Sequence, residues 1–77
     1  MCRSIKPLFN VDPPATDEEI RQASLQFVRK ISGFPRPSRA NAAAFDRAVD
    51  EVARGAQHLL DRLVTDAKPR VRRAEFK

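Results

Sequence analysis

The residue of this sequence best suited to covalent chemistry is Cys2. Removal of Met1 would place a free amine beside the Cys2 thiol, where the amine can act as the base for its own nucleophile. The neighbouring Arg3 would favour the thiolate. The sequence offers Cys2 no identifiable catalytic partner, so we interpret it as a structural or incidental thiol and expect no enzyme. An N-terminal cysteine nucleophile is the alternative.

Metal chemistry needs several ligands, and this chain holds one cysteine and one histidine. His58 follows Gln57 and lies one position off an apolar helical face, which is typical of a boundary histidine. Cys2 and His58 together would make only half of a metal site, and the common zinc spacings are excluded. We therefore predict no metal and no cofactor.

Residues Gly33 to Pro37 are predicted to form a loop because they include two prolines and a glycine. Cationic residues lie on both sides of this loop. An aromatic side chain, Phe34, lies within this loop. If the chain folds back at the loop, all of these side chains meet at one end of the molecule, where they can bind an anion or a partner. The alternative is that the cations complement a helix dipole and Phe34 caps the core. The candidate binding residues are Arg29, Lys30, Phe34, Arg36 and Arg39.

The formal net charge of +5 is concentrated near the C-terminus. Residues 1–67 hold ten Lys/Arg against nine Asp/Glu, whereas residues 68–77 hold five against one. We expect a single helical domain over residues 1–67, including an N-terminal arm, and a flexible basic tail over 68–77. Such a tail can add non-specific affinity for phosphates.

A length of 77 residues bounds the molecule to one small domain, which excludes a Rossmann or barrel enzyme. The longest apolar run, Ala42 to Phe45, is far too short to cross a bilayer, so no membrane role is expected. The first residues show no apolar leader segment. The cytoplasm is the expected compartment.

Helix signals predict two elements. Thr16 and Glu19 form a capping box, and Gly33 is placed to end the helix, which predicts a helix over 17–32. A second apolar stripe predicts a helix over about 39–65. The short connection forces an antiparallel pair. The predicted seam sets Ile20, Phe27 and Ile31 against Phe45, Val49, Val52 and Ala56.

The N-terminal arm is irregular because Pro7, Pro13 and Pro14 interrupt it. Leu8 and Phe9 are expected to fold back onto the helices. The longer second helix leaves an overhang that needs a cover, either this arm or a second subunit. A homodimer through Leu59, Leu60 and Leu63 is therefore left open.

The chain resembles a family of short bacterial proteins catalogued as domain of unknown function 2277. The resemblance rests on Met1 to Lys6, Pro13 to Arg21 and Ala23 to Lys30, continues through Ala43 to Val49, and covers roughly residues 1–69. It implies a bacterial protein, but the family carries no known activity and lends no functional residues to this chain.

A looser similarity links Leu8 to Val11 and Ala15 to Arg21 with the start of a J-domain, the DnaJ co-chaperone module. It implies a J-domain-like antiparallel helix pair. J-domains need a His-Pro-Asp tripeptide in the loop to stimulate Hsp70, and here the loop reads Ile31-Ser32-Gly33-Phe34-Pro35. The resemblance therefore supports the hairpin and argues against Hsp70 stimulation.

The sequence thus predicts an all-α antiparallel helical hairpin with an irregular N-terminal arm. Its expected function is that of a small, non-enzymatic interaction or adaptor module with a protein partner. Nucleic-acid binding through the basic hairpin tip and the C-terminal tail is the alternative.

Overall fold

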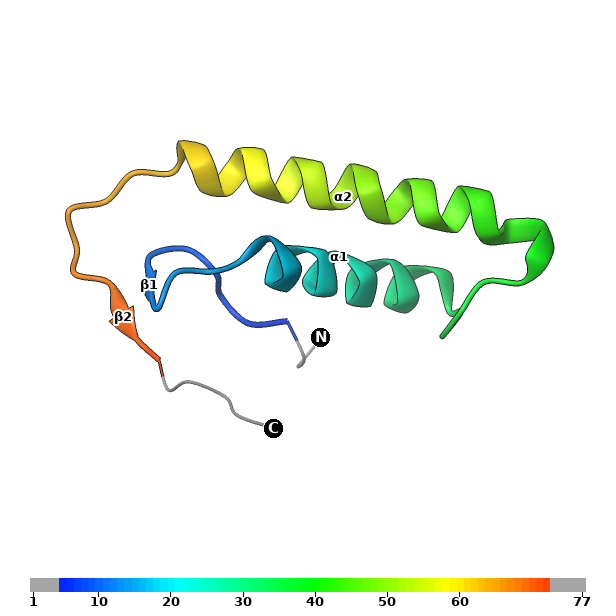
Figure 1. Ribbon diagram of the computed structural model, residues 1–77, viewed down its shortest axis with the longest axis horizontal. Coiled ribbons are helices and arrows are strands. Elements are labelled where there is room, and N and C mark those ends of the chain that lie inside the picture. The colour runs from blue at the N-terminus through cyan, green and yellow to red at the C-terminus, as the bar shows by residue number, and fades with distance from the viewer. Residues whose placement is uncertain (1–4, 73–77) are drawn as a thin grey trace.

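Two helices run side by side in opposite directions in the computed structural model, which describes residues 5–72 (Figure 1). In chain order the elements are β1 (Val11–Asp12), α1 (Asp17–Ser32), the 3-10 turn η1 (Arg39–Asn41), α2 (Ala42–Arg62) and β2 (Arg70–Val71). The antiparallel helical hairpin that the sequence predicts is confirmed. The molecule measures 45 × 30 × 21 Å along its principal axes.

The predicted bounds of α1 are confirmed at both ends. The Thr16 hydroxyl accepts a hydrogen bond from the Glu19 amide at 3.1 Å, and the Thr16 amide donates to the Glu19 carboxylate at 2.9 Å. Gly33 ends the helix in the left-handed conformation at φ 78°, and its amide donates to the Arg29 carbonyl at 2.9 Å. These bonds satisfy backbone groups that the helix ends would otherwise leave unpaired.

The second helix is shorter than predicted. Residues Arg39–Asn41 form the 3-10 turn η1, and α2 ends at Arg62 instead of residue 65. Leu63 has an extended backbone, and the chain then turns toward the arm, where the Asn10 side-chain amide donates to the carbonyls of Ala67 and Lys68 at 3.2 and 3.3 Å. These tertiary bonds require the chain to leave the helix before Ala67.

The core between the helices differs from the predicted seam. Its buried residues are Ile20, Ser24 and Val28 on α1 and Phe45 and Val49 on α2, with Leu25, Ala48 and Val52 packed against the cluster of Val28, Phe45 and Val49.

The prediction that Phe27 and Ile31 fill this seam is wrong, because they are 44% and 67% exposed. The α1 face turned toward α2 steps by four from Ile20 through Ser24 to Val28. Ser24 can lie at its centre because its hydroxyl donates to the Ile20 carbonyl at 2.8 Å, which satisfies a buried polar group.

A two-stranded parallel sheet corrects the all-α prediction, and residues 70–72 of the predicted tail take part in it. In the sheet, Val11 lies opposite Arg70 and Asp12 opposite Val71. The Arg70 amide donates to the Asn10 carbonyl at 2.9 Å, and the Arg72 amide donates to the Asp12 carbonyl at 2.8 Å. The fold is therefore mostly helical, with the segment after α2 paired to the N-terminal arm.

Candidate functional site

The predicted binding residues gather at the hairpin tip, the end of the molecule where α1 and α2 are joined (Figure 1). Arg29 and Lys30 form the last turn of α1, Arg36 lies in the connecting loop, and Arg39 begins η1. All four cations are exposed, as is the loop residue Phe34. The structure brings these five residues to one end of the molecule.

No acidic residue lies between Glu19 and Asp46, so the hairpin tip carries only positive charge. Arg29 makes one long hydrogen bond, from its Nη1 to the Gln26 side-chain oxygen at 3.4 Å. In residues 5–72, the side chains of Lys30, Arg36 and Arg39 form no hydrogen bond or ion pair. The tip cations are thus available to an outside anion.

Two arginines between the tip and the opposite end are paired. Arg21 contacts Asp50 at 2.7 Å across the two helices, and Arg47 contacts Glu51 at 3.4 Å along α2. These pairs lie on exposed surface, where ion pairs contribute little to stability. In each pair the carboxylate offsets the charge of the arginine, which distinguishes these two arginines from the tip cations.

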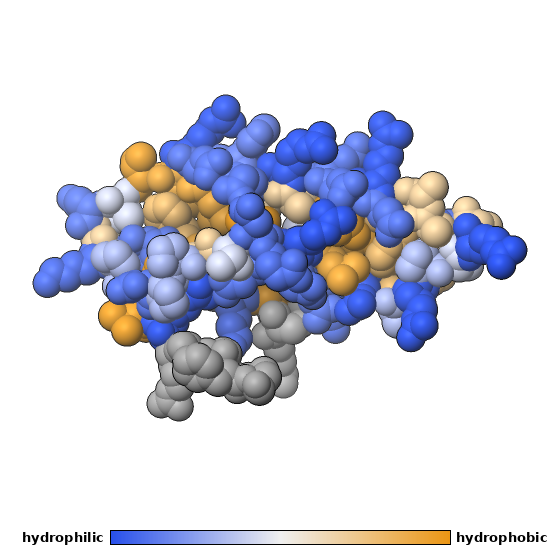
Figure 2. All heavy atoms as spheres, in the orientation of Figure 1, coloured by the Kyte–Doolittle hydropathy of each residue, from blue (hydrophilic) through white to orange (hydrophobic). Residues whose placement is uncertain are grey.

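A shallow apolar groove lies at the same end of the molecule, between the last turns of α1 and the first turns of α2, and none of the four tip cations lines it. Its volume is about 290 Å³, and Phe34, 41% exposed, borders it. Figure 2 shows one face of the molecule, on which hydrophilic side chains predominate and hydrophobic atoms surface in separate patches between them. The hairpin tip therefore combines positive charge with accessible apolar surface. The main apolar residues lining the groove are Val28, Ile31, Phe34, Ala44, Phe45 and Ala48.

At the opposite end of the hairpin, Arg72 bonds the segment after α2 to the N-terminal arm and to the first turn of α1. Its guanidinium donates to both oxygens of Glu19, at 2.7 and 2.9 Å, and to the carbonyls of Pro13 and Pro14, at 2.8 and 3.1 Å. These bonds to Arg72, together with the backbone bond from Thr16, lower the pKa of Glu19 from 4.5 to about 2.

Sequence reasoning missed these bonds, because Arg72 was assigned to a flexible tail. It lies 53 residues from Glu19, and no short sequence pattern predicts an ion pair between residues so far apart. The capping box signalled Glu19 as a helix-start residue, but not as the partner of a distant arginine.

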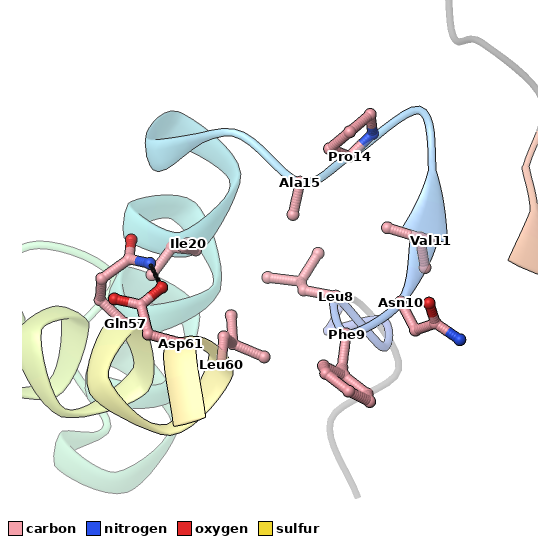
Figure 3. A pocket seen from close by; sticks show the side chains of 10 residues that line it. All are labelled: Leu8, Phe9, Asn10, Val11, Pro14, Ala15, Ile20, Gln57, Leu60 and Asp61. Carbon is pink, nitrogen blue, oxygen red and sulfur yellow. Dashed lines mark hydrogen bonds between the residues drawn. The ribbon is translucent and has the colours of Figure 1, made fainter. Parts of the chain in front are cut away.

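A cavity of about 300 Å³ separates the N-terminal arm from the helices at this end. Figure 3 shows Leu8 reaching into the space between the arm and the side chains of Ile20 and Leu60. Leu8 and Phe9 are half-buried, so the arm folds back as expected. The only hydrogen bond drawn among the residues of Figure 3 joins Gln57 to Asp61 at 2.8 Å. This carboxylate makes no cluster with a second one among the residues lining the cavity.

The structure describes one of the two remaining candidate residues, His58. Cys2 lies outside the described residues, and His58 is exposed on α2. Among residues 5–72, no group of three or more His, Cys, Asp or Glu side chains is arranged to hold a metal ion. Within the same range, neither helix combines the length and the apolar character needed to cross a membrane.

These features define a small helical-hairpin protein with a basic, partly apolar tip. At the opposite end Arg72 is bonded to Glu19 and to the N-terminal arm. The chain belongs to the family described as "Uncharacterized conserved protein (DUF2277)", whose match spans residues 1–77. No curated protein and no solved structure matches the chain. The similarity to a J-domain therefore rests on the sequence pattern alone.

Proposed function

We propose that this protein is a small, non-enzymatic interaction module that binds an acidic surface of another protein through its hairpin tip. The observation that carries the proposal is the cluster of four cations, in a stretch of 26 residues without a carboxylate, beside the exposed side chain of Phe34. Arginines at the same end of the molecule as an exposed aromatic side chain match the composition of protein interfaces, where arginine and aromatic residues are enriched.

A protein partner suits this surface better than a nucleic acid does, because the tip includes an apolar groove that phosphates cannot fill. The alternative combined the tip with the C-terminal tail, but residues 68–72 lie at the other end of the hairpin (Figure 1). Arg72 is also bound to Glu19. The cations of the tip and of residues 68–72 therefore do not form one continuous patch.

The test compares two variants of equal charge. The first replaces the four tip cations, Arg29, Lys30, Arg36 and Arg39, with alanine. The control replaces four cations away from the tip: Arg47, Arg54, Arg62 and Lys68. Tagged proteins are used to capture partners from a lysate of the source organism. The proposal expects the tip variant to lose a partner that the control retains; equal capture by both would refute it.

A salt titration of the captured complex then separates the two partner classes. Binding that depends on phosphates weakens steeply as salt rises, with a slope set by the number of phosphates contacted. Binding that includes burial of Phe34 in a protein pocket falls less steeply. Loss of the captured material on nuclease treatment would establish the nucleic-acid alternative.

The J-domain similarity supports the helical-hairpin shape on which this proposal depends, but it implies no activity. The loop between α1 and η1 contains neither histidine nor aspartate, so we propose that the protein does not stimulate Hsp70. A purified Hsp70 should show the same ATPase rate with and without this chain. The single cysteine, which has no pairing partner in the sequence, supports the cytoplasm of a bacterium as the proposed compartment.

A further inference from the structure

The two strands of the small sheet are separate from the helical hairpin. β1 and β2 pair with each other, and no Cα atom of either strand lies within 8 Å of a Cα atom in α1 or α2. Figure 1 shows this strand pair beyond the first turn of α1. A cavity of about 300 Å³ lies between the N-terminal arm and the helices, so the two parts pack incompletely against each other.

The bonds of the strand pair join the arm to the segment after α2. The Arg70 amide donates to the Asn10 carbonyl, and the Asn10 side chain donates to two further carbonyls of that segment. The Arg72 amide donates to the Asp12 carbonyl. Within residues 5–72, no backbone hydrogen bond joins residues 10–12 or 67–72 to either helix. An isolated pair of strands is marginally stable at best, so each segment depends on the other to stay in place.

One side chain connects the strand pair to a helix. The Arg72 guanidinium donates to both oxygens of Glu19 in the first turn of α1, at 2.7 and 2.9 Å. In the described part of the chain, no other side-chain hydrogen bond or ion pair joins residues 10–12 or 67–72 to α1 or α2. The two side chains are 26% and 38% exposed, so water reaches both groups and can replace each of them in the other's bonds.

Few apolar contacts oppose separation of the strands from the hairpin. Among residues 10–12 and 70–72, only Val11 is buried. The core cluster of Val28, Phe45 and Val49 joins the second half of α1 to the first half of α2, toward the hairpin tip. A region with few buried apolar contacts and exposed backbone hydrogen bonds opens at a lower free energy than the core beside it.

We infer that residues 10–12 and 70–72 form a latch that opens as one unit while the helical hairpin stays folded, and that Arg72 holds the latch closed. Opening carries Leu8 away from Ile20 and Leu60, which border the same cavity (Figure 3). Apolar surface of the helices that the arm covers is then exposed to solvent. The hairpin tip lies at the other end of the molecule, so the inference goes beyond the proposed function and does not depend on it.

Hydrogen exchange measured by NMR on the full chain reports this opening amide by amide. Arg70 and Arg72 provide two latch amides, and Val28 and Val49 provide two helix amides. The latch amides should be equally protected, and about tenfold or more less strongly than the helix amides. Urea below the unfolding transition should speed exchange of the helix amides alone, because opening the latch exposes little surface. Latch amides that are as protected as the helix amides, or not protected at all, would overturn the inference.

A substitution tests the role of Arg72 in the latch. Arg72→Met removes the donors to Glu19 and keeps an unbranched stem, and exchange at the Arg70 amide should become about fivefold faster, as expected for a partly exposed ion pair. Lys68→Met is the matched control, because it removes the same charge from the same segment, and the Lys68 side chain forms no hydrogen bond or ion pair in the described chain. The control should leave this exchange rate unchanged. Equal rates in the wild type and Arg72→Met would refute the role of Arg72.

Limited proteolysis shows whether the arm moves together with the strands. Chymotrypsin cleaves after phenylalanine, and cleavage follows the population of the open form when opening and closing are fast. The initial rate of cleavage after Phe9 should rise in Arg72→Met by the same factor as exchange at the Arg70 amide. Cleavage after Phe45, which requires the hairpin to unfold, should stay about tenfold or more slower. A Phe9 site that Arg72→Met leaves unaffected, or that is cut no faster than Phe45, would contradict the inference.

Discussion

Replacing Glu19 by glutamine should make the stability of this protein less dependent on pH. The Glu19 carboxylate accepts two hydrogen bonds from Arg72 and one from the Thr16 amide, and these bonds hold its pKa at about 2 instead of 4.5. A carboxylate whose pKa is depressed by folding stabilises the folded state at pH values above 4.5. This stabilisation is lost as the pH falls from 4.5 through 2.

The size of the effect follows from the shift and the exposure. A difference of 2.5 units between 4.5 and 2 corresponds to roughly 3.4 kcal/mol as an upper bound. The Glu19 side chain is 38% exposed, so solvent screens the interaction, and measured values for exposed pairs lie near 0.2–1 kcal/mol. Because Arg72 donates to both oxygens of Glu19, we expect Glu19→Gln to lower the free energy of unfolding by about 1 kcal/mol at neutral pH. Near pH 2 the change should be close to nothing.

Urea unfolding followed by helical circular dichroism, repeated from neutral pH down to pH 2, measures this difference directly. Glu18→Gln is the control, because it removes the same charge from the same helix end while its carboxylate contacts Gln22 instead of Arg72. In an Arg72→Ala background, Glu19→Gln should lose most of its effect. A stability difference between wild type and Glu19→Gln that is equal at neutral pH and at pH 2 would refute this explanation.

Three further predictions concern the hairpin itself. Phe45→Ala should destabilise the fold by about 3–5 kcal/mol, enough to unfold a domain of this size, and thermal circular dichroism checks it. Gly33→Ala should lower the free energy of unfolding by about 1 kcal/mol because Gly33 has a positive φ of 78°. Gly55→Ala should raise it by up to about 1 kcal/mol, so the urea midpoints of the two variants should move in opposite directions. Arg21→Ala should change the midpoint by less than about 1 kcal/mol, since its pair with Asp50 is half-exposed, and a larger loss would show that this contact holds the helices together.

Local signals predicted the helical elements well because the physics that sets them is local. The capping box at Thr16 and the left-handed Gly33 act within one turn of the helix they bound. The folding back of Leu8 and Phe9 followed from the need to cover apolar surface on the longer helix. The gathering of the tip cations then followed from the hairpin alone.

The errors came from tertiary contacts that no short window contains. The apolar spacing on α1 was compatible with either Phe27 or Val28 facing α2. In the structure Val28 is buried, together with Ser24, whose hydroxyl donates to the Ile20 carbonyl. Arg72 was missed for a related reason. Its carboxylate partner lies 53 residues away, and a basic segment after a proline has the composition of a solvated tail.

The parallel pairing of β1 with β2 has a consequence for the order of events during synthesis. The ribosome makes the arm first and delivers Arg72 only after both helices, so nascent chains carry an arm whose anchor does not yet exist. Helices dominated by nearby contacts can form early, whereas a contact across most of the chain must wait. The arm can therefore be secured only after residues 70–72 have been made, and the loss of these residues would remove their bonds to Asn10 and Asp12.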